Sequence, residues 1–131
     1  MTARFCLISI GSRGDVAPFI AVGQALRGAG HEGVLVVLEP WRDLVEAAGL
    51  DCQSVPLGDE ALWPHSPVLR DAMIAQPGLM WAGMRHHAAR SAPVVVDTLC
   101  AATVGADAIV SGGITRQMGH TLARRRSLPR N

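Results

Sequence analysis

The sequence predicts an α/β fold in which helices cover both faces of a parallel sheet, giving three layers. Short apolar runs at residues 4–10, 33–38 and 106–111 have the length and unbroken hydrophobicity of buried parallel strands. Stretches of helical periodicity separate these runs, and such alternation is typical of a parallel sheet. The 14 glycines and the absence of tyrosine suit tight packing between the layers.

The first three predicted elements form a β-α-β unit. Residues 4–10 (R-F-C-L-I-S-I) predict a buried strand that ends at a glycine. A helix is expected from Pro18 to about Ala29, because apolar side chains recur there at helical spacing and proline suits a first helical position. Asp15 lies just ahead of it as a candidate N-cap. Residues 33–38 predict the second strand, reached by a right-handed crossover.

The alternation continues along the rest of the chain. A helix starts near Pro40, residues 51–57 predict a weaker third strand, and residues 58–67 predict a loop. Two or three helices follow, with breaks expected near Pro77 and Pro93 because proline interrupts helices.

A fourth strand is predicted at residues 106–111, followed by a turn at 112–113 and a last helix at 114–126. An x-Pro at 128–131 would normally lead into another strand. We therefore expect residues 1–131 to be part of a domain, with an uncovered sheet edge through which the chain could self-associate.

The composition narrows the class of protein. Hydrophobic residues make up 49% of the chain, charged residues 18%, and the net charge is +1, which gives no electrostatic case for a nucleic-acid partner. No run approaches the roughly 20 apolar residues of a membrane span, although peripheral membrane contact stays open. Cys6, Cys52 and Cys100 form no C-x-x-C pair, and no secretion signal is visible. We therefore expect reduced thiols in a cytoplasmic protein.

The candidate binding and catalytic residues lie in the turn after the first strand. It reads Gly11-Ser12-Arg13-Gly14-Asp15, and it lies at the carboxyl end of a strand, where open α/β sheets bind ligands. Its glycines let the backbone approach a ligand, and the amides of a helix N-terminus favour an anion. Arg13 adds a positively charged guanidinium, whose N–H donors form a rigid fork. Asp15 adds a carboxylate that can act as a general base.

The motif extends well beyond this turn. Residues 11–32 read G-S-R-G-D-V-A-P-F-I-A-V-G-Q-A-L-R-G-A-G-H-E, and further matching segments are V-L-V-V-L-E-P, V-P-L-G and G-A-D-A-I-V-S-G-G. This pattern resembles the opening of GT-B glycosyltransferases of the family 28 N-terminal group. That group includes sterol glucosyltransferases, macrolide transferases and glycopeptide antibiotic transferases. Ala17, Gly33 and the basic run at 124–126 depart from the family pattern.

The resemblance implies a function and a set of roles. It implies the Rossmann-like N-terminal, acceptor-side half of an inverting glycosyltransferase, which moves a hexose from a nucleotide-diphosphate sugar to a hydroxyl of a lipid, sterol or natural product. Asp15 would be the base, and Gly11, Ser12, Arg13 and Gly14 would lie near the donor diphosphate. The family's donor-binding domain is missing from this sequence, so the chain alone is expected to be inactive. No metal or cofactor is implied beyond the nucleotide sugar as co-substrate.

Several alternatives remain open from the residues alone. Asp15 could be only a helix cap, and His31 and His65 would then be the next candidates for the base. Glu39 lies near where a ribose-binding acid would sit in a dinucleotide-binding protein, but the G-x-G-x-x-G pattern is missing. The chain could also be a non-catalytic remnant or a partner-binding module.

A pair of histidines and an apolar cluster in the predicted helices can be explained by structure alone. His86 and His87 are adjacent, so on a helix they cannot easily share a metal ion. Leu79, Met80, Trp81 and Met84 form an apolar cluster at helical spacing. Core packing is the expectation for this cluster, and the wall of an acceptor pocket is the alternative.

Overall fold

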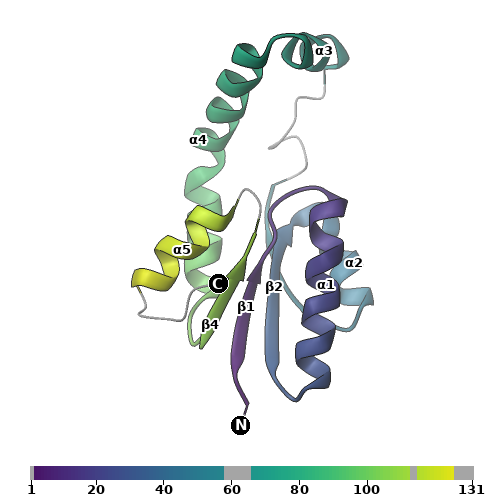
Figure 1. Cartoon of the computed structure of the whole chain (residues 1–131), viewed down its shortest axis with the longest axis vertical. Helices are drawn as coiled ribbons and strands as arrows, with labels where there is room; N and C mark the ends of the chain where they lie inside the picture. The colour runs from purple at the N-terminus through teal and green to yellow at the C-terminus, as the bar shows by residue number, and fades with distance from the viewer. Residues whose placement is uncertain (1, 58–65, 113–114, 126–131) are drawn as a thin grey trace.

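The computed structural model describes residues 2–57, 66–112 and 115–125 of the chain (Figure 1). Its centre is a four-stranded sheet in the order β3-β2-β1-β4, and all neighbouring strands are parallel. The strands are β1 (Arg4–Ile8), β2 (Glu32–Leu38), β3 (Asp51–Val55) and β4 (Ala108–Ser111). The predicted parallel sheet is confirmed. The first strand is shorter than expected, although the Ser9 amide still donates to the Val36 carbonyl at 3.0 Å.

Helices cover both faces of this sheet, as predicted (Figure 1). On one face lie α1 (Arg13–Gly28) and α2 (Arg42–Ala47), and on the other α4 (Pro77–Ala102) and α5 (Arg116–Arg125). Because successive strand residues point to opposite faces, β1 places Leu7 in the core beneath α1 and α2, and Cys6 and Ile8 in the core beneath α4 and α5. A 3₁₀ turn, η1 (Glu39–Trp41), joins β2 to α2.

Helix α1 begins at Arg13, five residues before the predicted start at Pro18. Ser12, with φ −78° and ψ 175°, is the N-cap, and Asp15 lies in the first turn of the helix. The prediction of Asp15 as the N-cap is therefore wrong. Pro18 is tolerated inside the helix at the loss of the N–H that would bond the Gly14 carbonyl.

Helix α4 runs without a break through Pro93, which also corrects the sequence prediction. Pro93 is exposed. The helix is held to the sheet just beyond it by Val95, Leu99 and Ala102, all of them buried. Burial of these side chains offsets the missing hydrogen bond at the proline. The break predicted near Pro77 is confirmed, because α3 (Pro67–Ala75) ends two residues earlier. No helix in the described ranges is both long and apolar enough to cross a membrane.

The apolar cluster at the start of α4 does not belong to the core. Trp81 is 63% exposed and Leu79 is 40% exposed, so the expectation of core packing is wrong for both. The side chain of Met84 lies outside the described part of the structure, as do residues 58–65 of the predicted loop and the end of the last predicted helix at Arg126. Figure 1 shows why the cluster is exposed: α3 and the first half of α4 extend away from the sheet.

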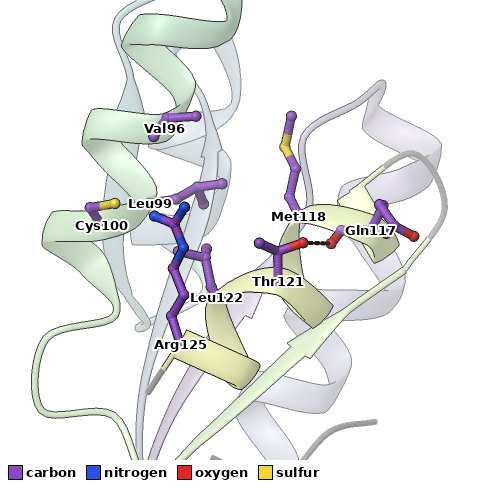
Figure 2. Close-up of a pocket in the computed structure, with 8 residues that line it drawn as sticks. All are labelled: Val96, Leu99, Cys100, Gln117, Met118, Thr121, Leu122 and Arg125. Atoms are coloured by element: carbon purple, nitrogen blue, oxygen red, sulfur yellow. Dashed lines mark hydrogen bonds between the residues drawn. The ribbon is translucent and has the colours of Figure 1, made fainter. Parts of the chain in front are cut away.

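A groove of about 220 Å³ lies between α4 and α5 (Figure 2). Gly119 and Ala123 of α5 are buried, and a Cβ on Gly119 would collide with the Ser111 side chain of β4, so α5 approaches the strand closely there. Met118 and Leu122 of α5 pack against the core cluster that contains Leu99 of α4. The groove is lined by Val96, Leu99, Cys100, Gln117, Met118, Thr121, Leu122 and Arg125.

Candidate functional site

The turn after β1 lies at the carboxyl edge of the sheet, between the ends of β2 and β4. It is closed on one side by the segment that follows β4. A Cβ placed on Gly112 would lie 3.4 Å from the ring of Phe19 in α1, so this segment packs directly against the helix that follows the turn. The sequence-predicted residues Gly11 to Asp15 are thus at the edge where the parallel strands converge, as expected.

The carboxylate of Asp15 folds back over the turn. Its Oδ2 accepts hydrogen bonds from the Ser12 amide at 2.8 Å and from the Ser12 hydroxyl at 2.9 Å. It also occupies the space beside Gly11, where an added Cβ would collide with Oδ2 and lie 2.9 Å from Cγ. Gly11 is therefore required by lack of space and not by its backbone angles. Gly11 and Ser12 together fix where this carboxylate lies.

The backbone of the turn is held from two other directions. The buried Ser9 hydroxyl donates to the Asp15 carbonyl at 2.9 Å. The indole Nε1 of Trp41, which follows β2, donates to the Gly11 carbonyl at 3.0 Å. These bonds connect β1, α1 and η1, so the position of Asp15 depends on three elements of the fold.

The exposed side of the turn offers both an acceptor and donors. Asp15 is exposed, and its Oδ1 receives no hydrogen bond from the described residues. The amides of Arg13 and Gly14 lie in the first helical turn and have no acceptor within the described part of the chain. Arg13 is exposed as well. The turn can therefore accept a proton at one atom and bind an anion beside it.

A sequence model of the glycosyltransferase family 28 N-terminal domain matches residues 5–114. The chain belongs to this family. The match includes the whole turn and the four strands of the sheet, apart from Arg4 at the start of β1.

Two curated relatives are sugar transferases whose names give different substrates. O-mycaminosyltylonolide 6-deoxyallosyltransferase of Streptomyces fradiae is 41% identical over a match that covers 56% of this chain and 20% of that enzyme. Sterol 3-beta-glucosyltransferase of Saccharomyces cerevisiae is 42% identical over 40% of this chain and 4% of that enzyme. The family 28 domain described here thus spans about a fifth of the length of the first relative.

The fold is shared with solved antibiotic glycosyltransferases. The calicheamicin glycosyltransferase CalG4 superimposes with a TM-score of 0.73 over 99% of this chain and 30% of that protein, at 17% identity. A glycosyltransferase of kitacinnamycin superimposes with a TM-score of 0.67 over 98% of this chain and 29% of that protein. The parallel sheet with its helices is that of the Rossmann-like N-terminal domain of GT-B enzymes.

Two titratable groups, one in α2 and one in β3, have displaced pKa values. The hydrogen bond from Arg42 Nε to Glu46 Oε1, 3.1 Å long, holds the pKa of Arg42 above its ordinary value. Burial raises the pKa of the Cys52 thiol in β3 to about 11. Because nucleophilic attack requires the thiolate, this cysteine is a poor nucleophile at neutral pH. Within the described ranges, no three His, Cys, Asp or Glu side chains come together as a metal site.

The other residues singled out from the sequence lie away from the turn or take ordinary roles. His31 precedes β2 at the opposite, amino edge of the sheet, where its Nδ1 accepts the Ala3 amide at 3.1 Å. It is therefore unsuited to replace Asp15, and His65 lies outside the described residues. Glu39 is exposed at the start of η1, but the glycine pattern of a dinucleotide site remains missing.

Sequence reasoning missed three residues that brace the site: Ser9, Trp41 and Thr115. Thr115 is buried, and its hydroxyl donates to the Gly112 carbonyl at 2.9 Å and lies 3.2 Å from the Ile8 carbonyl. Ser9 at the end of an apolar run was a weak signal, because a buried hydroxyl needs a partner. The partners of Trp41 and Thr115 are distant in the chain, so no local pattern indicates them.

Replacing Thr115 with valine is expected to lower the free energy of unfolding by about 1–2 kcal/mol, because valine keeps the shape but removes a buried donor. Urea unfolding would measure the loss. The control is Thr121→Val, at an exposed position of α5 beside the groove, where the hydroxyl donates to the Gln117 carbonyl of its own helix at 3.0 Å. That change should stay within about 0.5 kcal/mol. Equal losses in the two variants would contradict the bracing role of Thr115.

Proposed function

We propose that this chain is the acceptor-side part of an inverting glycosyltransferase. The reaction moves a hexose from a nucleotide-diphosphate sugar to a hydroxyl of a lipid, sterol or natural-product acceptor. Membership of the family and its macrolide and sterol relatives support the reaction class. The observation that carries the proposal is the Asp15 carboxylate, which is fixed by Ser12 at Oδ2 and exposed at the carboxyl edge of the sheet.

In the proposed reaction, Asp15 Oδ1 takes the proton of the acceptor hydroxyl. The acceptor oxygen then forms a bond to the anomeric carbon of the sugar. The bond from that carbon to the diphosphate oxygen breaks, and the nucleotide diphosphate leaves with the electron pair. Attack from the side opposite the leaving group inverts the anomeric configuration. A positioned base of this kind contributes about 10²- to 10⁴-fold to the rate.

The other residues of the turn divide between base and donor. Gly11 and Ser12 leave space for the Asp15 carboxylate and orient it, through the close approach and hydrogen bonds described above. Arg13 and the amides of Arg13 and Gly14 are proposed to face the donor diphosphate, whose negative charge grows as the bond to the sugar breaks. Ser12, whose amide and hydroxyl hold Asp15, is proposed to lie beside the same diphosphate.

We propose that the remaining components of the reaction lie beyond residues 1–131. The match covers about a fifth of the first curated relative, and a donor-binding domain would supply the nucleotide sugar. Neither a metal ion nor a further cofactor is part of the proposal. The cytoplasmic location and the self-association through an uncovered sheet edge, both expected from the sequence, stay predictions.

A fusion of residues 1–131 to the donor-binding domain of the Streptomyces fradiae relative would test the proposal. With an α-linked nucleotide sugar and a panel of sterols, macrolides and lipids, we expect transfer to at least one acceptor and a β-linked product by NMR. The chain alone should not turn over any nucleotide sugar. An α-linked product, a well-folded fusion inactive on every acceptor, or turnover by the chain alone would each contradict the proposal.

A further inference from the structure

The peptide group between Gly11 and Ser12 is hydrogen-bonded at both of its ends. Its carbonyl, which belongs to Gly11, accepts from the Trp41 indole Nε1 at 3.0 Å. Its amide, which belongs to Ser12, donates to Asp15 Oδ2 at 2.8 Å. One planar group therefore connects the indole that follows β2 to the carboxylate in the first turn of α1.

The two bonds at this peptide group depend on each other. In a trans peptide the C=O and N–H lie in one plane and point in opposite directions, so a rotation of the group moves both bonds at once. Hydrogen bonds in such a chain also polarise one another, so a donor at the carbonyl strengthens the bond that the amide donates. Trp41 can therefore act on Asp15 Oδ2 without touching it.

The indole is held in place by the sheet and not by the turn. Trp41 is half-buried and packs against the buried clusters on both faces of the sheet. The next residue, Arg42, reaches β3, where its Nη1 donates to the Ser54 hydroxyl at 3.1 Å. Gly11 is buried, so its carbonyl needs a hydrogen-bond partner from the protein. The sheet core thus sets the position of the donor that holds this carbonyl.

We infer that Trp41 is a positioning residue for Asp15. Its indole N–H fixes the peptide group of Gly11 and Ser12, and the Ser12 amide in turn fixes the carboxylate at Oδ2, leaving Oδ1 directed to the acceptor hydroxyl. This inference rests on the proposed function and deepens it, because it assigns a role in the reaction to a residue outside the turn. A purely structural role, in which the indole only fills space, would be met equally well by phenylalanine.

Trp41→Phe tests the inference in the full chain without any sugar transfer. Phenylalanine keeps an aromatic ring in the packing and removes the N–H donor. We expect the Ser12 amide to exchange with water about 5-fold faster, as measured by NMR, which is the effect of weakening one ordinary hydrogen bond. Trp81→Phe is the matched control, because it makes the same change at an indole that is 63% exposed on α4. It should leave the exchange rate of the Ser12 amide unchanged.

Kinetics of the fusion enzyme separate positioning from stability. Trp41→Phe should lower kcat by about 5-fold and leave the dissociation constant of the nucleotide sugar unchanged. When Asp15 is already asparagine, the same substitution should change the residual kcat by less than about 2-fold, because no base is left to position. Val95→Ala truncates a buried side chain beneath α4 and controls for lost stability. It should leave kcat unchanged at temperatures where the enzyme is folded.

The outcomes distinguish this inference from the proposed function. An unchanged exchange rate of the Ser12 amide in Trp41→Phe would overturn the inference, and so would equal losses of kcat with Asp15 present and with asparagine in its place. Parent-like kcat in Trp41→Phe, beside a large loss in Asp15→Asn, would refute the role of Trp41 alone. Full transfer by Asp15→Asn would instead refute the proposed base, and the role of Trp41 with it.

Discussion

Replacing Asp15 with asparagine in the fusion enzyme is expected to lower kcat by about 10²- to 10⁴-fold, because the acceptor hydroxyl then loses its base. Asparagine keeps the shape of the side chain, and its amide oxygen can still accept from the Ser12 amide, as Oδ2 does now at 2.8 Å. Folding and donor binding should therefore survive. Steady-state kinetics, together with the dissociation constant of the nucleotide sugar, would separate lost chemistry from lost binding.

The matched control is Asp97→Asn, an exposed carboxylate on α4 away from the turn, which should leave kcat unchanged. Gly11→Ala provides an independent probe of the same idea, since an added Cβ would displace the Asp15 carboxylate without removing it. If Asp15→Asn retained full transfer, Asp15 would serve only to brace the start of α1. The base would then lie outside this turn.

Replacing Leu99 with alanine is expected to lower the free energy of unfolding by about 2–5 kcal/mol. Leu99 is 1% exposed and joins α4 to the core beneath it. It also lines the groove of about 220 Å³ between α4 and α5 (Figure 2), so the truncated side chain would enlarge an existing gap. Since domains of this size are stable by about 5–15 kcal/mol, this loss is a large part of the total.

Val96→Ala on the same helix is the control for this experiment. Val96 lines the same groove but is 45% exposed, so its removal should cost less than about 1 kcal/mol. Thermal and urea unfolding would compare the two variants. A loss for Leu99→Ala no larger than that for Val96→Ala would show that α4 is not held to the sheet in the way described.

The sheet was predictable because buried parallel strands leave a local signal. Apolar runs of five to seven residues marked β1 and β2, and the glycine after β1 marked the turn at the carboxyl edge of the sheet. The start of α1 was not predictable from Pro18, because the Ser12–Asp15 interaction begins the helix earlier than proline preference suggests. Local preference likewise failed at Pro93, where packing of α4 against the sheet decides the outcome.

The place of Asp15 in the turn at the sheet edge was predictable, whereas the contacts that support it were not. Asp15 is marked by the motif in which it stands. Its placement depends on the Trp41 indole, which bonds a carbonyl 30 residues earlier, and the nearby edge depends on Thr115, whose hydroxyl lies beside a carbonyl 107 residues earlier. Such contacts exist only once the strands are in register, and no spacing along the chain indicates them.

The central place of β1 has a consequence for biosynthesis. One edge of this strand pairs with β2, which follows within 30 residues, but the other pairs with β4, and the Arg4 amide bonds Asp107 across 103 residues. During translation, β1, β2 and β3 can therefore assemble while one side of β1 still has no partner. At about 5–20 residues per second, the ribosome needs several more seconds to deliver β4. Throughout that interval the strand leading to Asp15 has an open edge, so the nascent chain is most vulnerable to mispairing directly beneath the turn that holds this carboxylate.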